Sequence, residues 1–430
     1  MNKEKTTRLV IDKIVDTCFV AALFLSLASL NLENIDIYFY YIFVSFLIPV
    51  LVYRYQTIDA WLVIIMSFLA VHSLINVLFG NNDLLSVLKN ICGISFAYWF
   101  YYLVLKHYNY NISFLFQLYY KFSFWTATIG FIQFFSYLLH FKPGYNFSWL
   151  GLRVLAGSEF AGVQFYPIHS ITGEPAAFAV LLAPAVYKAL ADLKSKTLNS
   201  NKFIPITIIS SYLLTQSSTA YFGLISCAAV LTIHNFSIKR ILIGLVAVPM
   251  VIFLLFSISP KFSERLESSV KLATGNIILD AATSDNVNGS SVILFNHFVI
   301  AAENAKNHPL GTGLGSHHIA FKRYNTLKVW FTGYGGPGSM ILNLHDANSL
   351  FSRILSEFGY FGVILMFAFI FRNFIPSQTQ DNSHLVLINH ASLIALLTNI
   401  LRGGHYFNLG LPFFVFCYYY SRKLNKSEDV

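Results

Sequence analysis

Charged residues are scarce in this chain of 430 residues, where Asp, Glu, Lys and Arg together make up 11%. Soluble domains carry roughly 25% of such residues, so this scarcity excludes a soluble enzyme and a disordered protein. Cysteine is scarce as well, with 4 residues in the chain, which excludes a disulfide-stapled scaffold. All four cysteines lie in apolar segments. We interpret them as small buried hydrophobic residues rather than as disulfide partners or metal ligands.

Apolar residues dominate instead: 56% of the chain is hydrophobic, and Phe, Tyr and Trp alone make up 17%. A helix needs about 20 mostly apolar residues to cross a bilayer. The sequence therefore predicts an all-α, polytopic integral membrane protein, with a single transmembrane domain over 1–430 and about twelve transmembrane helices. Their approximate bounds are 11–31, 35–53, 58–80, 84–106, 112–140, 173–193, 203–217, 219–236, 241–258, 347–371, 384–402 and 406–421.

Basic residues lie in alternate short loops, as Lys194 and Lys196 do, and the loops between them carry few cations. Because Lys and Arg are enriched in cytoplasmic loops, both termini are predicted to be cytoplasmic. Two long loops, about 141–172 and 259–346, then lie on the outer side. The apolar stretch 291–305 in the second loop predicts an amphipathic helix on the membrane surface. The net charge of +9 forms no stripe suited to nucleic acid, so we expect no such partner.

The tenth expected span opens with the polar run His345-Asp346-Ala347-Asn348-Ser349 and carries Arg353 and Glu357 further along. One polar stripe takes up about half of the helix circumference and consists of His345, Asn348, Ser349, Ser352, Arg353, Ser356 and Glu357. An ionisable group inside a membrane costs roughly 2.5–3.5 kcal/mol, so it usually has a partner or a function. Arg353 and Glu357 have the spacing of a structural ion pair. We predict a functional role for His345 at the outer mouth of the stripe; the alternative for the whole stripe is a polar face packed against other helices.

Three further helix starts on the predicted outer side carry polar residues, namely Thr172-Gly-Glu174-Pro175, Ser217-Ser218-Thr219 and Gly403-Gly404-His405. Free N–H groups and the positive end of the helix dipole favour anions at such starts. Four loop arginines could complete an outward-facing site for phosphate: Arg153, Arg265, Arg323 and Arg402. Helix capping for Thr172 and Ser218, and solvation for each arginine, are the alternatives.

The glycine-rich loop Gly311-Thr-Gly-Leu-Gly315 precedes the adjacent residues His317 and His318. The loop lacks the spacing and the strand–helix context of a dinucleotide-binding motif. Two adjacent histidines do not define a metal site without further ligands. We interpret the segment as a turn and expect no metal and no cofactor.

The motif His345-Asp-Ala-Asn-Ser-Leu, followed by Glu357-Phe-Gly-Tyr-Phe-Gly362, resembles the signature of the bacterial O-antigen polymerase and ligase superfamily. Three other segments resemble that family's motifs in the same order: Gly173-Glu174-Pro175, Ser217-Ser218-Thr219 and Pro309-Leu-Gly-Thr-Gly-Leu-Gly315. The resemblance covers roughly residues 150–370. The chain departs from the family in two places. Its Ser/Thr segment has no arginine, and His345 is followed by Asp346, which leaves open whether Asn348 fills the family's amide role.

The resemblance implies a membrane glycosyltransferase of the bacterial inner membrane, with its active site facing the periplasm and the two long loops periplasmic. The donor would be a glycan on undecaprenyl pyrophosphate, attacked by an acceptor hydroxyl. His345 would be the catalytic base, and Glu174 the second candidate for base or orienting group. Substrate-binding roles would fall to Arg153, Arg265, Arg323, Asn348, Arg402, His405, Ser217 and Ser218. A chain-length regulator protein is a possible partner.

Three functions compete within this interpretation. We favour a polymerase that joins lipid-linked repeat units into surface polysaccharide. A ligase that transfers the finished glycan to lipid A core is the alternative, because the motifs do not separate the two. A transporter of lipid-linked oligosaccharide is less favoured, since transporters place charged residues near the membrane centre, often in two related halves. Here the ionisable residues gather toward one face.

Overall fold

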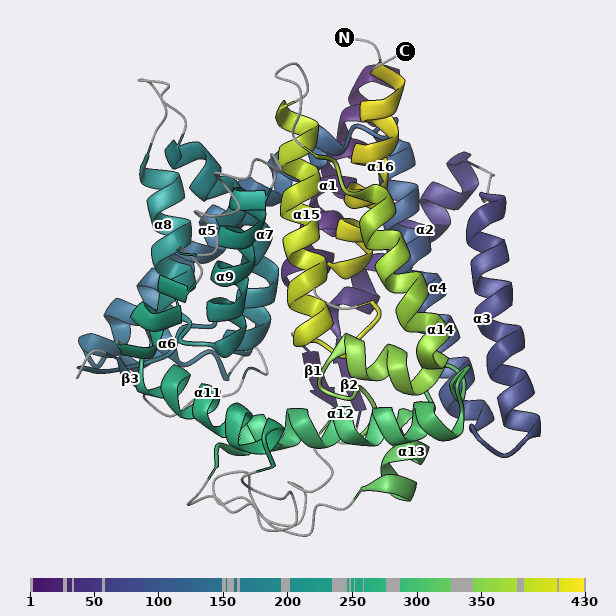
Figure 1. Ribbon diagram of the computed structural model, residues 1–430. Coiled ribbons are helices and arrows are strands. Elements are labelled where there is room, and N and C mark those ends of the chain that lie inside the picture. The colour runs from purple at the N-terminus through teal and green to yellow at the C-terminus, as the bar shows by residue number, and fades with distance from the viewer. Residues whose placement is uncertain are drawn as a thin grey trace.

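The structure, a computed structural model, is built almost entirely of helices (Figure 1). It describes the chain except for residues 1–2, 26–28, 33–34, 56–58, 149–151, 153–157, 161–162, 195–201, 234–245, 247–248, 251, 258, 276–286, 326–342, 377–382, 408–409 and 429–430. Two short antiparallel hairpins interrupt the helices. They are β1 (Ser29–Leu32) with β2 (Ile35–Tyr38), and β3 (Ser158–Phe160) with β4 (Val163–Phe165).

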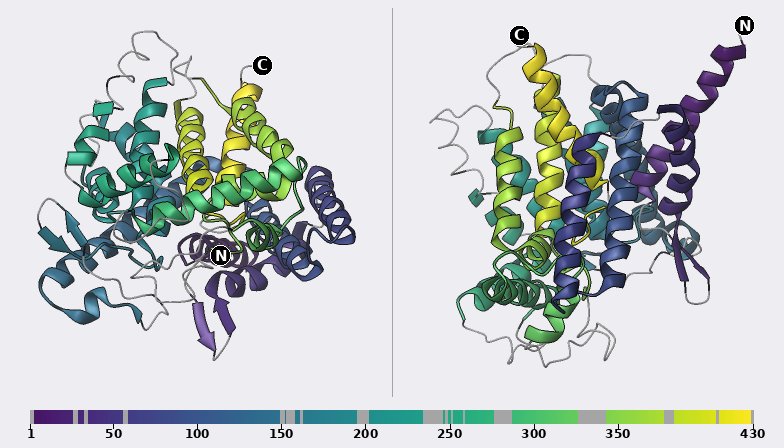
Figure 2. Two further views of the ribbon diagram at one scale, coloured as in Figure 1. Left: turned by 60° about the horizontal axis from the view of Figure 1, so that its bottom comes forward. Right: turned by 90° about the vertical axis from the view of Figure 1, so that its right-hand side faces the viewer.

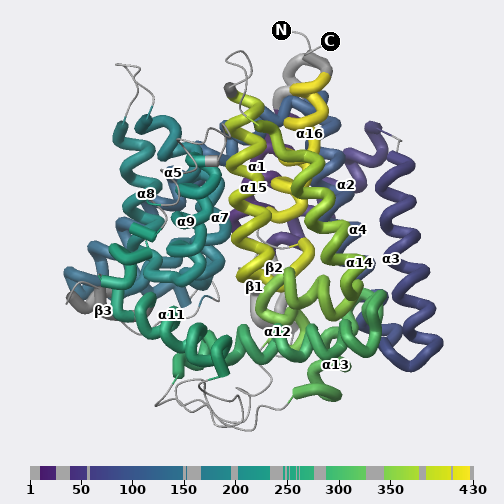
Figure 3. The backbone as a smooth tube through the Cα atoms, viewed as in Figure 1, coloured from purple at the N-terminus to yellow at the C-terminus, as the bar shows by residue number. Residues whose placement is uncertain are grey.

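The long helices lie side by side and run between two ends of a bundle, and both chain termini emerge at the same end (Figures 1 and 3). In chain order the bundle helices are α1 (Lys3–Phe24), α2 (Phe39–Tyr55), α3 (Ala60–Leu78), α4 (Leu84–His107), α5 (Ile112–Leu138), α7 (Pro175–Lys194), α8 (Phe203–Leu214), α9 (Ser218–Ile233), α14 (Leu350–Asn373), α15 (Ser383–Leu401) and α16 (Leu411–Glu428). A single turn, α6 (Lys142–Tyr145), follows α5.

Among the described residues, five helices are long and apolar enough to cross a membrane: α3, α4, α7, α14 and residues His384–Leu401 of α15. The outer helix α3 has the surface expected of a helix in contact with lipid. Only 17% of its apolar window is buried inside the protein, and the rest faces outward. The prediction of a helical protein with membrane-spanning helices is confirmed at this level. The total of twelve spans stays a prediction, and the expected span 241–258 lies partly outside the described residues.

A tyrosine hydroxyl from α5 forms two hydrogen bonds with the backbone of α7. Pro184 lies inside this helix and removes one backbone donor. The Tyr119 hydroxyl of α5 donates to Leu181 O at 2.6 Å and accepts from Ala185 N at 3.1 Å. These two backbone groups would bond to each other in an uninterrupted helix. The buried hydroxyl therefore satisfies both groups at the proline irregularity and ties α5 to α7.

Three helices cap the bundle at the end opposite the termini: α11 (Pro260–Ala273), α12 (Gly289–Asn307) and α13 (His317–Tyr324). The α12 helix crosses beneath the bundle (Figures 1 and 2) and includes the helix expected over 291–305. One face of α12 is buried, because Ala301 and Ala305 pack against Leu355 of α14. The expected long loop 259–346 is therefore largely a helical cap wherever the structure describes it.

Candidate functional site

The site is built where α14 is broken. The helix expected over 347–371 begins at Leu350 and is interrupted at Gly359, whose φ of 61° and ψ of −155° are not helical. The glycine-rich loop 309–315 enters at this break. Its Gly313 N–H donates to Glu357 O at 2.8 Å, and Pro309 O accepts from Tyr360 N–H at 3.0 Å. Backbone bonds from a distant loop thus replace helical bonds on both sides of Gly359.

Substitution of Gly359 by alanine should be strongly destabilising. Its backbone lies in a region that only glycine occupies readily, which costs other residues about 1–3 kcal/mol. A Cβ would also collide with Pro309 O. Gly275→Ala is the matched control, because Gly275 has a φ of 73° but open space around its Cβ position. Thermal melting in detergent should show a clearly larger loss for Gly359→Ala; equal losses would contradict the close contact with the loop.

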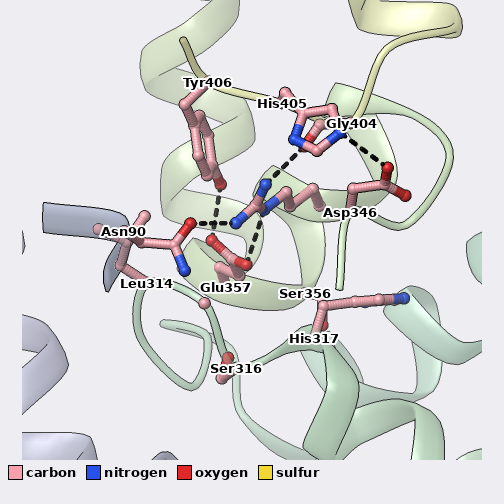
Figure 4. Close-up of polar contacts among 12 residues, drawn as sticks. Asn90, Leu314, Ser316, His317, Asp346, Ser356, Glu357, Gly404, His405 and Tyr406 are labelled. Atoms are coloured by element: carbon pink, nitrogen blue, oxygen red, sulfur yellow. Dashed lines mark hydrogen bonds and ion pairs between the residues drawn. The ribbon is translucent and has the colours of Figure 1, made fainter. Parts of the chain in front are cut away.

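A buried arginine organises the first half of α14, and its partners Asn90, Glu357, Gly404 and Tyr406 are labelled in Figure 4. Arg353 is 3% exposed, and its guanidinium donates to Glu357 Oε1 at 2.9 Å, to Gly404 O at 2.7 Å and to Asn90 Oδ1 at 2.6 Å. Its Cζ lies 4.5 Å from the ring centroid of Tyr406, whose hydroxyl donates to Glu357 Oε2 at 2.9 Å. Arg353 and Glu357 form the predicted ion pair, which also joins α14 to α4 and to the segment before α16.

His345 lies in the turn before α14 and is exposed. Its ring centroid is 5.1 Å from that of His318 on α13, and His318 Nε2 lies 2.9 Å from Asp83 Oδ2. The next residue in the turn, Asp346, has Oδ2 3.0 Å from Nε2 of His405. His345 is therefore flanked by two histidine–aspartate pairs, contributed by four separate segments of the chain.

The environment of His345 keeps its imidazole neutral. Partial burial, followed by the positive charges of His318, Lys89 and Arg353, lowers the pKa of His345, and the charge of Asp346 opposes them. A pKa below the usual value of about 6.5 leaves the ring unprotonated at neutral pH. A neutral, exposed imidazole can accept a proton from a bound hydroxyl group.

The turn that carries His345 is fixed by its neighbouring carboxylate. Ala347 and Asn348 have φ values of 58° and 57°, a left-handed region that residues with a side chain adopt infrequently. The Asn348 N–H donates to Asp346 Oδ1 at 3.0 Å. Burial alone would raise the pKa of Asp346, but the hydrogen bond and charge of His405 and the Asn348 N–H lower it to about 2. Asp346 is therefore ionised at physiological pH.

Three of the predicted substrate-binding residues lie around this turn. Asn348 belongs to it, and Arg402 and His405 lie on the segment whose Gly404 backbone packs against it, since a Cβ on Gly404 would overlap Asp346 O. Arg323 is exposed on α13, with Nη1 3.4 Å from His308 Nε2.

Glu174, the second predicted catalytic residue, is exposed at the start of α7, where its backbone C=O accepts from Phe178 N–H at 3.0 Å. The α7 helix packs against α15, which lies between α7 and α14 (Figure 1). The Thr172 hydroxyl donates to His169 O at 2.8 Å. This bond points it to the preceding turn and not to a backbone N–H of α7. Arg153 lies outside the described residues.

Arg265, Ser217 and Ser218 form a second polar cluster. Arg265 on α11 donates from Nη1 to Ser218 Oγ at 2.5 Å, at the start of α9. Ser217 Oγ accepts from Thr219 N–H at 3.2 Å. The Tyr221 hydroxyl of α9 donates to Gln216 Oε1 at 3.0 Å.

The α12 helix links the second cluster to the His345 turn. Ser291 Oγ donates to Arg265 O at 3.3 Å near the beginning of α12. Leu344, next to His345, packs against the apolar cluster that includes Ile300 further along this helix. At 1.5 Å per residue, Ser291 and Ile300 are about 14 Å apart along the axis. The two clusters therefore lie at one end of the bundle, but in separate places.

Sequence reasoning missed Asp83, which is the N-cap of α4, and Lys89 and Asn90 within that helix. It also assigned His318 to an ordinary turn. Asp83 had a visible signal, because an aspartate directly before an apolar run on the outer side marks a helix N-cap. Its pairing with His318 had none, since it depends on folding of the cap onto the α3–α4 connection. Among the described residues, no group of three His, Cys, Asp or Glu side chains has the arrangement of a metal site.

No model of a known protein family matches this chain, and no curated protein matches it in sequence.

Proposed function

We propose that the protein is a membrane glycosyltransferase that polymerises undecaprenyl-pyrophosphate-linked oligosaccharide repeat units into surface polysaccharide. The observation that carries this proposal is the setting of His345. An exposed, neutral imidazole lies between two histidine–aspartate pairs in the turn before α14, and α14 begins at the end of the bundle opposite both termini (Figure 1). Such a group suits deprotonation of a sugar hydroxyl. The resemblance of the surrounding motifs to the O-antigen polymerase and ligase superfamily supports the same reaction.

In the proposed reaction the acceptor hydroxyl attacks the anomeric carbon of the donor glycan. His345 takes the hydroxyl proton, the new glycosidic bond forms, and the bond from the anomeric carbon to the lipid pyrophosphate breaks. Charge then develops on the departing pyrophosphate. Arg402, His405 and Lys89 are the cationic or potentially cationic groups near the turn that suit its stabilisation. Asp346 Oδ2, 3.0 Å from Nε2 of His405, would keep that ring oriented.

A polymerase handles two lipid-linked substrates, which suits the presence of two polar clusters. The acceptor's reactive hydroxyl lies at the far end of its oligosaccharide from its own pyrophosphate. We assign that second pyrophosphate to Arg265, Ser217 and Ser218, about 14 Å along α12 from the His345 region. Glu174, at the same end of the bundle, suits an orienting role toward the glycan. Arg323, which is exposed on α13, belongs to the same proposed surface, and a substrate-binding role for Arg153 stays a prediction.

The proposed membrane topology has twelve spans, with both termini in the cytoplasm and the site in the periplasm. The common end of the two termini supports this assignment (Figure 1), as does the enrichment of Lys and Arg in the loops expected at that end. The protein would lie in the bacterial inner membrane, and the proposed partner there is a chain-length regulator protein.

Reconstitution tests the proposed function directly. Purified protein in liposomes, supplied only with undecaprenyl-pyrophosphate-linked repeat unit, should produce a ladder of longer lipid-linked glycans. Transfer that occurs only after lipid A core is added would identify a ligase and contradict the polymerase. Movement of intact substrate across the bilayer without chain growth would identify a transporter.

A further inference from the structure

Each ring nitrogen of His318 lies close to an oxygen atom, one by a hydrogen bond and the other by the distance of an ion pair. Its Nδ1–H donates to Gly315 O at 2.9 Å, and its Nε2 lies 2.9 Å from Asp83 Oδ2. A backbone carbonyl and an ionised carboxylate can only accept hydrogen bonds. An unprotonated Nε2 at 2.9 Å from a carboxylate oxygen would bring two lone pairs together, so the geometry points to a proton on each ring nitrogen. The ring is also 8% exposed, so water does not readily replace either acceptor.

Asp83 is held in its ionised form by the start of α4. Its Oδ1 accepts from Ser86 N–H at 2.8 Å as the helix N-cap, where the helix dipole favours negative charge. Partial burial raises the pKa of Asp83, but the hydrogen bonds from Ser86 and the charge of His318 outweigh burial and lower it. Asp83 therefore caps α4 with one carboxylate oxygen and faces the His318 ring with the other.

We propose that Asp83 and His318 are positioning residues, a fixed carboxylate–imidazolium pair whose positive ring lies against His345 and keeps it neutral. The role of that neutral ring as a base rests on the proposed function; the charge pair itself does not. Other charged groups act on His345 from the surrounding elements: Lys89 of α4, Arg353 of α14 and Asp346 of its own turn. Of the cations, His318 is the one in ring contact with His345, and its charge depends on Asp83.

The pH dependence of chemical modification of His345 tests the pair without requiring activity. Diethyl pyrocarbonate reacts with neutral imidazole, and mass spectrometry of the full-length protein in detergent measures the extent of modification at each histidine. The midpoint is the pH at which modification of His345 is half-maximal. Asp83→Asn removes the charge but retains a good N-cap residue. Loss of a nearby negative charge alone would move the His345 midpoint to lower pH. If Asp83 holds the proton on His318, the midpoint should instead move to higher pH, because the neighbouring cation is lost.

A second variant and a control separate this effect from misfolding. His318→Gln removes the cation while leaving Asp83 in place, and should also move the His345 midpoint to higher pH. Asp59→Asn makes the same change at the N-cap of α3. Asp59 lies at the start of α3, whereas Asp83 follows the end of that helix, so this variant should leave the His345 midpoint unchanged. An unchanged or lowered midpoint in Asp83→Asn, with α4 still folded by thermal melting, would overturn the proposal.

The proposed function can fail separately from this pair. In the reconstituted assay, the acid limb of polymer synthesis should move with the modification midpoint in both variants. A shifted midpoint with an unshifted acid limb would support the charge pair and reject His345 as the base.

Discussion

Substitution of His345 by alanine should reduce polymer synthesis by at least about 100-fold, the lower range of the contribution of a general base. His345 is exposed in a turn, so its loss should cost little stability, as is usual for surface residues. The protein should therefore reach the membrane and melt like the wild type. Gel analysis of lipid-linked glycans from reconstituted liposomes measures the effect, and polymer of normal length from this variant would reject the assigned role.

The matched control is His384→Ala. His384 is also exposed, but it lies at the end of the bundle near the termini, where its Nδ1 is 3.0 Å from Ser113 Oγ. This variant should synthesise polymer normally. In the proposed reaction, the wild-type protein should also show an acid limb below about pH 6.5. The lowered pKa of His345 keeps the base neutral down to that region, and activity falls as the pH drops through the folded value.

The helices could be predicted because their causes are local. The expected span 84–106 corresponds to α4, Leu84–His107, since an apolar run follows the capping residue Asp83. The expected span 173–193 corresponds to α7, which starts at Pro175 as the first-turn preference of proline predicts. The break in α14 could not be predicted in this way. Gly359 adopts its conformation because the loop 309–315 supplies backbone partners that lie far away in sequence.

The candidate site follows the same division. His345, Asn348 and His405 could be singled out because each accompanies a polar run at a predicted helix start. The Asp83–His318 pair beside His345 could not, because a carboxylate in one short turn and an imidazole in a distant cap pair only after folding. The structure also does not bring Arg265, one of the four arginines predicted for an outward-facing phosphate site, to the His345 turn. Arg265 of α11 contacts Ser218 of α9 near the beginning of α12, about 14 Å along the α12 axis from the region of the turn.

Substitution of Arg353 by alanine should have the largest effect on stability, a loss of about 3–5 kcal/mol. Glu357 is 0% exposed and would keep a buried charge without its cationic partner. Gly404 O and Asn90 Oδ1 would each lose a donor at the same time. Thermal melting in detergent, or the fraction of monodisperse protein after heating, measures the loss. Tyr406→Phe should cost less, because it removes one hydrogen bond to Glu357 and leaves both charges paired.

The expected loss of stability arises from burial of the two charges and not from the ion pair as such. The chain offers a control pair with the same i,i+4 spacing. Lys188 and Asp192 form an ion pair on α7, with side chains 21% and 30% exposed against 3% and 0% for Arg353 and Glu357. Because water solvates the partner that is left behind, Lys188→Ala should cost no more than about 1 kcal/mol. Replacing both buried charges in Arg353→Met with Glu357→Gln should recover part of the stability that Arg353→Ala loses, because no unpaired charge remains buried. Equal losses for Lys188→Ala and Arg353→Ala would show that the buried network does not hold α14 in place.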